Sequence, residues 1–593
     1  MIAVDALGPN GEYRTRAREV ITDIAGTPVA ELSIAPPLFV SRSIRAQRST
    51  RPLPAVRRKA ALAEAAQIFA GAEIAGYGFD QYIEVVSRVS GLPIAVARNS
   101  ACGVTEAIRH AFEAVAPARP VGATFDWRDE RTRRGSALWV RRGEVLAVHA
   151  SGNSPGVHGG WVQALALGYR VAVRPSRREP FTGARLVQSL RRAGFRPEDA
   201  LYLPTDHAGA AEIIAAADLA IVYGGQDVVD KYADDPAVMV NGPGRTKILI
   251  TAERDWRDYL DVIVESISGQ AGMACTNTTA VLYEGDPRQL AEAIAARLAT
   301  VQPFPIADER AVLPGQPLDA ARRVANHLAE KSRGTTALLG ADQVVADLGD
   351  GSAVLRPAVH LLHAPDVGKL NTELAFPCVW IAPWTRADGL VPLRHSLVIN
   401  AITDDGELID ALVDEPTISN VYSGRHPTTY TAPEIPHDGF LADFLMRTRD
   451  DTMADLVNQK IRYILLSGAH VDLDTLDLLR EIFPRTVIAM AFGSTMILSQ
   501  AKTRLDGDIH VFDPRTPYVV FWVIDPETGE RVPHGQRGQV VMNHIGKGMF
   551  IPNNLERDTA IRRQGPGGQI GDSVSEVAPV ATFEGEAVIE GVY

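Results

Sequence analysis

Strand-like and helix-like segments alternate between residues 137 and 265, and this alternation limits the folds that the chain can adopt. Short apolar runs typical of buried strands occupy residues 137–140, 145–148, 170–173, 201–203, 219–223 and 247–251. Helical apolar spacing fills the intervening stretches at residues 159–167, 183–193 and 208–217. The pattern predicts a parallel, doubly wound α/β sheet, in which a ligand normally binds at the carboxyl ends of the strands.

The chain of 593 residues is too long for a single hydrophobic core, so we expect several domains. A second α/β region follows at residues 270–420, and the polar, Pro-containing stretch 430–452 is typical of a domain boundary. We therefore predict one domain at 1–265, a second at 266–445 and a small, separate α/β domain at 455–593.

The charge balance and the cysteine content exclude several classes of protein. A formal net charge of −12 argues against nucleic acid or an anionic membrane as the main partner. Three Cys residues cannot form a disulfide framework, which favours a reducing, cytoplasmic setting. The N-terminal residues lack an apolar core of signal-peptide length, and charged residues interrupt the longest apolar run, at 208–223. We expect neither a membrane span nor a metal site.

A single thiol, Cys275, lies where a predicted helix at 258–267 meets a predicted strand at 279–283. Gly and other small residues precede it in the stretch 268–274. A thiol in this setting, without a second Cys nearby, is typical of a nucleophile rather than of a metal ligand or a disulfide. The alternative is that Cys275 is a small buried hydrophobic residue, as most single cysteines are.

Asn153 follows the predicted strand 145–148, in the turn 151–156. An Asn at a strand end can direct its amide N–H groups at a developing oxyanion. The alternative is an ordinary turn, because the surrounding Ser, Gly and Pro are turn residues. Nearby His149 and His158 are candidates for a general acid or base, although a lone His is more often structural.

A basic run follows the next predicted strand and consists of Arg174, Pro175, Ser176, Arg177 and Arg178. A cationic residue at a strand end can hold the ribose or phosphate of a cofactor. The two further Arg residues favour the additional 2′-phosphate of NADP. The alternative is a solvated basic loop.

Two more segments carry weaker signals for the same kind of ligand. Gly224 and Gly225 close the strand 219–223 and open a predicted helix, where helix N–H groups can face a pyrophosphate. Further along, Glu373 begins a stretch that ends at Pro377, and its carboxylate can accept hydrogen bonds from a ribose.

Taken in order, these segments resemble the aldehyde dehydrogenase superfamily over residues 40–445. Asn153 matches its oxyanion Asn, Cys275 its nucleophile, and the stretch from Glu373 to Pro377 its Glu-x-Phe-Gly-Pro motif, with Phe376 in place of Gly. The resemblance implies a Rossmann-type cofactor domain at 1–265 and an α/β catalytic domain at 266–445. It also implies an NAD(P) cofactor held by the segments after Arg174, Gly224 and Glu373.

One departure separates the chain from the oxidising members of that superfamily. Those members carry a Glu, in a Glu-Leu-Gly-Gly-Lys motif, that activates the water which hydrolyses the thioester. The corresponding stretch here, 240–247, contains no Glu. The chain is therefore similar to the acyl-CoA reductase branch, in which a thioester on the nucleophile is reduced to an aldehyde. Alternatives are an oxidising enzyme whose base lies elsewhere and a stand-alone acyl-CoA reductase.

The C-terminal segment resembles the second half of an adenylate-forming ligase of the phenylacetate–CoA ligase type. Gly493, Ser494 and Thr495 match the motif that meets the adenylate, and Asp572 matches the Asp that holds the ribose. Met496 replaces the Glu of the first motif, and Ile570 stands where the Thr of the second, Thr-Gly-Asp motif belongs. The phosphate loop of the ligase's first half does not occur in the sequence. We expect a docking module for an adenylating partner or a part of a split ligase; the alternative is an inactive remnant.

The whole arrangement is similar to the reductase component of two-component, ATP-dependent aryl carboxylic acid reductases of secondary metabolism. This implies reduction of an acyl adenylate or acyl thioester by NADPH (or NADH), with a separate adenylating protein as partner. A non-catalytic scaffold for a ligase remains the alternative from another class. The resemblance also implies a homo-oligomer, and the short stretch 122–143, where the family's oligomerising hairpin would lie, favours a dimer.

Overall fold

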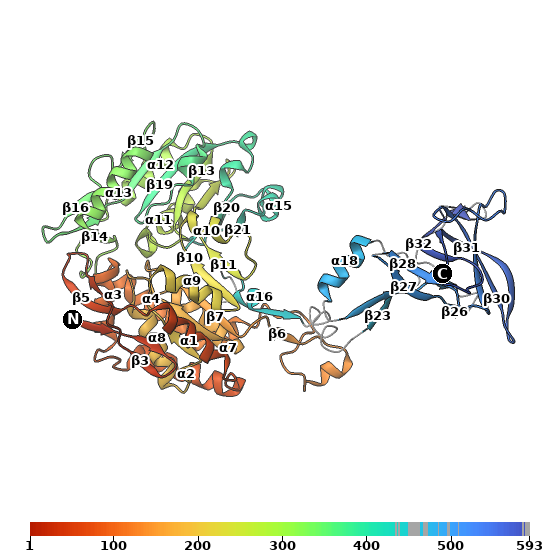
Figure 1. Ribbon diagram of the computed structural model, residues 1–593. Helices are drawn as coiled ribbons and strands as arrows, with labels where there is room; N and C mark the ends of the chain where they lie inside the picture. Colours follow the sequence, from red (N-terminus) through yellow and green to blue (C-terminus); the bar gives the residue numbers. More distant parts are fainter. Residues whose placement is uncertain are drawn as a thin grey trace. The chain divides into compact units, whose positions relative to one another are not determined.

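The computed structural model describes residues 1–432, 436, 439–448, 463–466, 473–483, 486–494, 499–507, 509–580, 582–583 and 586–587. It divides into two compact units, Met1–Thr448 and Arg449–Tyr593, and each is described by itself. Within the first unit, the red-to-yellow and the green-to-cyan halves of the ribbon each surround their own sheet (Figure 1).

The first sheet has seven strands in the order β11-β10-β7-β8-β9-β2-β3. Strands β11 to β9 are parallel, and β2 joins β9 antiparallel. The strands are β2 (Ala6–Gly8), β3 (Gly11–Tyr13), β7 (Val145–His149), β8 (Arg170–Arg174), β9 (Ala200–Tyr202), β10 (Leu219–Tyr223) and β11 (Val238–Asn241). The predicted parallel sheet is confirmed, with four of its six predicted strands in place.

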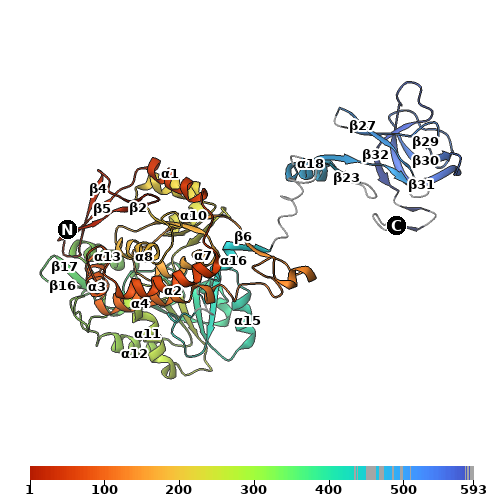
Figure 2. The ribbon, with the colours of Figure 1, turned by 90° about the horizontal axis from the view of Figure 1, so that it is seen from below.

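Helices cover both faces of this sheet because its central strands are buried on both sides. On one face, Val145 and Ala147 pack with residues of α1 and α9. On the other face, Leu146 and Val148 pack with α2, α4 and α8, and Figure 2 shows α2 and α4 side by side. The helices are α1 (Pro37–Arg48), α2 (Ala55–Gly71), α3 (Phe79–Ser90), α4 (Ile94–Arg109), α7 (Val162–Leu167), α8 (Phe181–Arg192), α9 (His207–Ala216) and α10 (Gln226–Tyr232).

The second sheet also has seven strands, in the order β15-β18-β19-β13-β12-β20-β21. They are β12 (Thr246–Ile250), β13 (Thr278–Glu284), β15 (Thr336–Leu339), β18 (Ala358–Leu361), β19 (Cys378–Trp384), β20 (Ser396–Ile402) and β21 (Ile418–Ser423). Helices α11 (Leu260–Ser268) and α12 (Arg288–Leu298) pack on one face, and α13 (Leu318–Lys331) and α15 (Gly406–Asp414) on the other.

Strand β12 corrects one boundary that the sequence predicted. The run 247–251 was expected in the first sheet, but β12 pairs with β13 and β20 in the second. The second sheet therefore begins with β12 at Thr246, ahead of the border predicted at 265. A strand covered on both faces has the same apolar sequence in either sheet, so its composition does not reveal its partners.

Three smaller sheets complete the first unit. One has the order β14-β17-β16, with β14 (Gly315–Pro317), β16 (Val345–Asp347) and β17 (Ser352–Leu355). β4 (Arg18–Thr22) forms an edge of the sheet β1-β5-β4, with β1 (Ile2–Val4) and β5 (Pro28–Ser33). The short strand β6 (Trp139–Arg141) pairs antiparallel with β22 (Met446–Thr448), at the end of this unit. The strand predicted at 137–140 therefore forms, but it does not belong to the first sheet.

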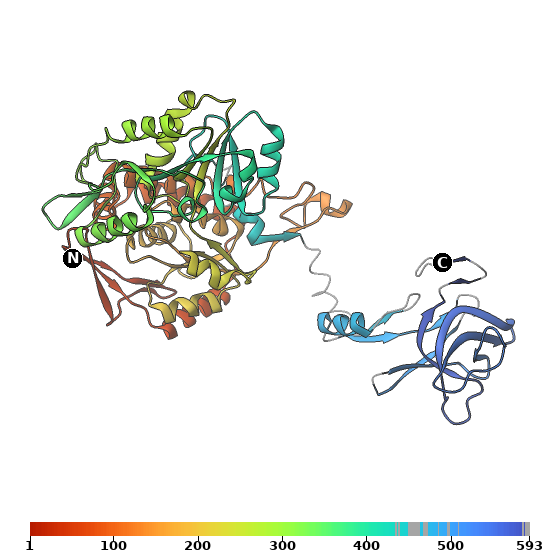
Figure 3. The ribbon, with the colours of Figure 1, turned by 90° about the horizontal axis from the view of Figure 1, so that it is seen from above.

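The C-terminal unit is built mainly from strands. A parallel pair, β23 (Tyr463–Leu466) and β24 (Val487–Met490), is connected through α18 (Leu473–Ile482). The larger sheet has the order β27-β28-β32-β31-β30-β29, and its dark blue strands curve strongly (Figure 3). Its strands are β27 (Lys502–Asp506), β28 (Ile509–Asp513), β29 (Val519–Ile524), β30 (Arg537–Ile545), β31 (Phe550–Arg563) and β32 (Ser573–Pro579). Among the described residues, no helix is long and apolar enough to cross a membrane.

Candidate active site

Cys275 lies half-buried in the loop between α11 and β13. Three consecutive residues shortly before it, Gln270, Ala271 and Gly272, adopt left-handed backbone conformations, with φ of 52°, 61° and 66°. This region of φ costs energy for residues with a Cβ, and such strain concentrates at functional sites. The Cys275 thiol thus lies on a loop whose strained backbone conformation is maintained by the surrounding structure.

Asn277 holds this loop through its side chain. Its Nδ2 donates to the carbonyl oxygens of Ser266 at 3.0 Å and Gly269 at 2.7 Å, and its Oδ1 accepts from the N–H of Ala274 at 2.9 Å. Asn277 is buried, so these bonds form away from water and are costly to lose. The sequence analysis missed this residue, because one Asn beside a predicted strand carries no recognisable signal.

Asn153 lies beside the nucleophile loop, as the resemblance implies. Its Nδ2 donates to the carbonyl oxygen of Met273 at 3.1 Å, while Ser151 Oγ donates to its Oδ1 at 2.5 Å. These bonds fix the amide group close to the residues that precede Cys275. An Asn side-chain amide has two N–H groups, so its bond to Met273 leaves one for an oxyanion.

The stretch before β12 lies directly against Cys275. A Cβ added at Gly244 would come within 2.6 Å of the Cys275 carbonyl carbon and 2.9 Å of its Cα. Thr246 Oγ1 donates to the Cys275 carbonyl oxygen at 3.0 Å. Gly is required at 244 because any side chain there would push the nucleophile loop away. This is also the stretch that carries no Glu.

Arg245 connects this stretch to two predicted cofactor segments. Its backbone N–H donates to Glu373 Oε2 at 2.9 Å, and its Nη2 donates to Gln226 Oε1 at 2.7 Å. Gln226 is the residue that follows Gly225 in the chain. Desolvation by the surrounding protein raises the pKa of the Glu373 carboxyl. Because the residue is exposed at the surface, water offsets part of that effect.

Pro377 and buried Phe376 pack against the nucleophile loop. A Cβ at Gly272 would lie within 2.7 Å of the Phe376 carbonyl carbon and of Pro377 Cδ. The stretch that begins at Glu373 therefore contacts the loop of Cys275 at its other end. The structure thus brings the Glu373, Cys275 and Gly225 segments to one place.

The basic run lies against the Asn153 turn. A Cβ at Gly152 would lie 2.5 Å from Ser176 Oγ and 2.8 Å from Arg178 Cβ. Burial, followed by the charge of Arg177, lowers the pKa of Arg174. Arg174 Nε is buried without a hydrogen-bond partner among the described residues. Pro175 is buried next to it.

Gly224 and Gly225 have different local roles. The N–H of Gly224 donates to the Asn241 carbonyl at 3.1 Å, which extends the β10–β11 pairing. A Cβ at Gly224 would lie 2.5 Å from Val228 Cγ2, so Gly lets α10 pack closely on the strand. Gly225 is the N-cap of α10.

Lys247 is a buried charge that the sequence analysis did not single out. Burial lowers its pKa to about 7. Its Nζ donates to Ser396 Oγ at 2.7 Å and to the Arg245 carbonyl at 3.0 Å, which ties β12 to the start of β20. The residue therefore supports the backbone of Arg245 rather than facing the nucleophile loop. No signal in the sequence distinguishes it from a surface Lys.

The two histidines near Asn153 are buried. Burial lowers the pKa of His149 to about 3 and that of His158 to about 4. His158 Nδ1 accepts a hydrogen bond from Trp161 Nε1 at 3.1 Å. Both rings are neutral near pH 7, and His158 belongs to the core. Of the two roles considered for His158, general acid or base and structural residue, its burial in the core therefore favours the structural one.

The ligase-like positions are only partly described. Gly493 and Ser494 form the short strand β25, and Thr495 lies outside the described residues. Asp572 is buried, with Oδ1 accepting from Arg562 Nε at 2.8 Å and Oδ2 from the N–H of Val523 at 3.1 Å. Because both carboxylate oxygens are engaged within the sheet, Asp572 acts here as a structural residue.

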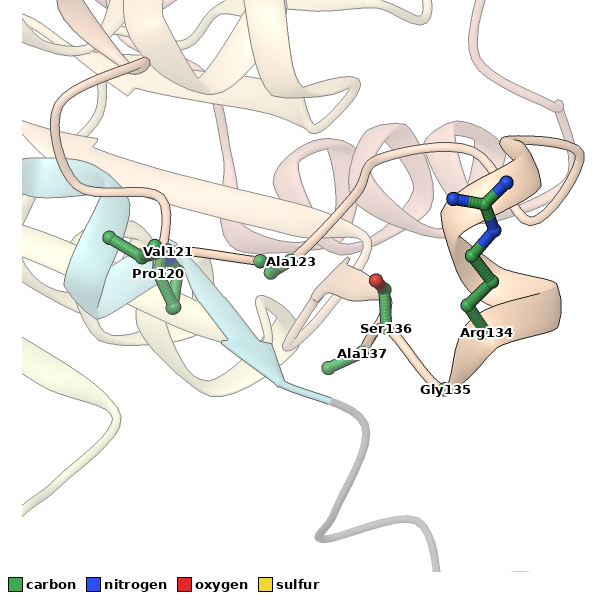
Figure 4. A pocket seen from close by; sticks show the side chains of 8 residues that line it. Pro120, Val121, Ala123, Arg134, Gly135, Ser136 and Ala137 are labelled. Carbon is green, nitrogen blue, oxygen red and sulfur yellow. The ribbon is translucent and has the colours of Figure 1, made fainter.

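Two open cavities lie elsewhere on the chain. One, of about 310 Å³, is formed by residues 120–123 and 134–137, with Arg134 on a short helix (Figure 4). The other, of about 530 Å³, lies on the larger sheet of the C-terminal unit beside Trp522, whose ring Arg531 covers at 3.1 Å. Neither is lined by a predicted site residue. Among the described residues, no cluster of His, Cys, Asp and Glu could hold a metal ion.

Comparison with solved structures finds the same fold in several enzymes. The aldehyde dehydrogenase KauB from Pseudomonas aeruginosa has 14% identity and a TM-score of 0.64, covering 75% of this chain and 96% of that one. An NAD-dependent aldehyde dehydrogenase from Sinorhizobium meliloti has 18% identity and a TM-score of 0.62, covering 75% and 93%. A variant of 1-pyrroline-5-carboxylate dehydrogenase from Thermus thermophilus has 16% identity and a TM-score of 0.62, covering 75% and 92%.

The fold is thus the α/β fold of aldehyde dehydrogenases. None of the curated proteins matches the chain by sequence. The sequence pattern of the aldehyde dehydrogenase family matches residues 18–421, well over half of the chain, and the protein therefore belongs to that family. Members of the family are NAD(P)-dependent oxidoreductases that act on the aldehyde group. Residues 449–593 lie beyond the matched range.

Proposed function

We propose that the protein reduces an activated carboxylic acid, as an acyl adenylate or acyl thioester, to an aldehyde through an acyl group on Cys275. The observation that carries this proposal is that Gly244 lies against Cys275, in the stretch 240–247, which contains no Glu. Without a carboxylate base at that position, water attacks the thioester slowly. The thioester then persists long enough to be reduced.

The residues act in a simple order. The Cys275 thiolate attacks the acyl carbonyl carbon, while the second N–H of Asn153 stabilises the oxyanion. The new C–S bond forms, and the bond to AMP or to the thiol of the donor breaks. When the thioester carbon has received a hydride, the C–S bond breaks, which releases the aldehyde and regenerates the thiolate. Asn277 and Gly244 keep Cys275 in place throughout.

The residues present fit a dinucleotide cofactor. Arg174 Nε is buried and unpartnered, so a ribose or phosphate oxygen would satisfy it. Arg174, Ser176 and Arg177 at the end of β8, and Gly225 and Glu373 beyond them, would hold NADPH (or NADH). The bound cofactor supplies the hydride. The indole-3-acetaldehyde dehydrogenase AldA from P. syringae, which shares this fold, was solved in complex with NAD+.

Intact-mass measurement after mixing with aryl and alkyl acyl-CoAs and with acyl adenylates, without reduced cofactor, tests the proposal. We expect a stable acyl adduct on the wild type and on Cys102→Ala, and none on Cys275→Ala. Cys102 is the matched control because it is exposed. An adduct that forms on Cys275 but is hydrolysed by water as fast as it forms would instead identify an oxidising dehydrogenase. No adduct from any thioester or acyl adenylate would favour the scaffold alternative.

We also propose that the C-terminal unit receives a separate adenylating protein. Three large apolar side chains, Tyr518, Ile545 and Phe550, are 60%, 56% and 73% exposed. They are neighbours, because Ile545 pairs with Phe550 across β30 and β31 and its N–H donates to Tyr518. Exposed apolar clusters of this kind are typical of protein interfaces.

The docking proposal is tested by the variant Phe550→Ser. With an adenylating ligase, ATP and the free acid, we expect slower aldehyde formation than for wild type. Aldehyde formation from acyl-CoA, which needs no partner, stays unchanged. The control is Leu505→Ser, at a similarly exposed residue on β27 of the same sheet. Equal rates for the two variants from the free acid would refute the docking role.

A further inference from the structure

The turn after β8 presents Arg177 in a fixed position. Ser176 and Glu179 form an isolated antiparallel bridge, so Arg177 and Arg178 stand at the tip of the turn. The N–H of Arg178 donates to Ser176 Oγ at 3.2 Å. Glu179 is fully buried, and its Oε1 accepts the N–H groups of Phe181 and Thr182 at 2.9 Å each, which anchors the turn to α8.

This turn lies where a doubly wound sheet recognises the adenosine ribose. β7 and β8 are successive parallel strands joined through a helix, and the turn is at the carboxyl end of the second of them. At this position an acidic side chain binds the 2′-hydroxyl of NAD, whereas an Arg accommodates the 2′-phosphate of NADP. The chemistry at the turn therefore decides which cofactor binds.

An acidic residue from a distant part of the chain occupies this turn as well. Glu19, on the edge strand β4, contacts Arg177 with its Oε2 2.8 Å from Arg177 Nε. The two side chains are 37% and 50% exposed, so a ligand can reach both. The neighbouring Arg18 is engaged with Glu31 at 3.0 Å, which leaves Glu19 facing Arg177.

We propose that Glu19 is a specificity-determining residue that weakens the preference for NADPH which Arg177 would otherwise give. With NADH, the Glu19 carboxylate accepts a hydrogen bond from the 2′-hydroxyl of the ribose. With NADPH, Arg177 must exchange Glu19 for the 2′-phosphate, and the carboxylate repels that phosphate. The site thus accepts both cofactors. This inference rests on the proposed cofactor site and goes beyond it by adding a residue from β4.

Equilibrium binding, followed by quenching of tryptophan fluorescence, separates this inference from the proposed reaction. NADPH and NADH are titrated into wild type, Glu19→Gln, Arg177→Gln and the double variant, with no acyl substrate present. Adenosine 2′,5′-bisphosphate and AMP, titrated by calorimetry, test the ribose end alone. The matched control is Glu31→Gln, which removes a similarly exposed ion pair from the same small sheet.

We expect Glu19→Gln to raise the ratio of NADPH affinity to NADH affinity about twofold to fivefold, the range that one partly exposed charge supports. Arg177→Gln lowers that ratio. When Glu19→Gln is added to Arg177→Gln, in the double variant, it changes the NADPH affinity much less than it does in the wild type. Glu31→Gln leaves the ratio as in wild type. Three results would overturn the inference. Glu19→Gln could change the NADPH and NADH affinities equally, it could give the same affinity ratio as Glu31→Gln, or neither cofactor could bind to the protein. A shifted ratio without acylation of Cys275 would leave the inference intact and refute the proposed reaction.

Discussion

Gly244→Ala tests the claim that the nucleophile loop depends on the close approach of two backbone segments. The added Cβ would lie 2.6 Å from the carbonyl carbon of Cys275. Carbon atoms normally keep about 3.5–4.0 Å apart, so the two segments must separate by about 1 Å. Backbone atoms cannot rotate away as a side chain can. The displacement therefore moves Cys275 itself.

A displacement of about 1 Å at a reacting group lowers the rate about 10²-fold. Overpacking of this kind also costs about 1–3 kcal/mol of folding stability. We expect Gly244→Ala to acylate Cys275 about 10²-fold more slowly in a stopped-flow assay with acyl-CoA. Urea unfolding gives the change in stability in the same variant.

Gly103→Ala is the matched control, since Gly103 lies in α4 with no atom within 4 Å of the added Cβ. We expect it to acylate at the wild-type rate and to gain about 0.5–1 kcal/mol of stability. Acylation of Gly244→Ala within threefold of wild type would refute the reasoning. It would show that the loop adapts without moving the thiol.

Three further predictions follow from the burial of particular side chains. Asn277→Ala removes three hydrogen bonds that the buried Asn277 side chain makes with the nucleophile loop. We expect the free energy of unfolding, measured in urea, to fall by about 2–4 kcal/mol and acylation of Cys275 to be slower. An unchanged acylation rate would contradict the positioning role of Asn277. Burial raises the pKa of the Cys378 thiol to about 12, so iodoacetamide at pH 8, followed by peptide mass analysis, should modify Cys275 and leave Cys378 intact in the folded protein. Burial lowers the pKa of His158 from 6.5 to about 4. Between these pH values the His158 ring is protonated in the unfolded chain and neutral in the folded chain. The free energy of unfolding therefore falls by about 3 kcal/mol as the pH is lowered from 6.5 to 4. His158→Gln should lose that part of the pH dependence of unfolding, and an unchanged slope would contradict it.

The parallel centre of the first sheet was predictable because β7, β8, β9 and β10 are short apolar runs bounded by turn residues. The same signal placed β12 in the wrong sheet, since a strand buried on both faces carries no mark of its neighbours. Strand β11 escaped prediction because three of its four residues are only half-buried and its apolar run is short.

In the site, the sequence identified chemical groups and the structure identified their supports. Cys275, Asn153 and Glu373 carry side chains whose chemistry is evident from their type. Asn277 carries equally common chemistry, and its role depends on the backbone atoms that it meets. Asp572 shows the reverse case, because its motif position suggested a ribose contact and the fold engages both of its oxygens.

The sequence by itself determined the local features: the alternating strands and helices, the nucleophile, the basic turn and the missing Glu. These depend on residue type and on spacing over a few positions. Only the tertiary structure decided that Gly244 touches Cys275, that Arg245 joins Gln226 to Glu373, and that Glu19 faces Arg177. Such contacts join residues far apart in the chain, and they depend on how the strands are ordered in each sheet, which residue type and local spacing do not encode.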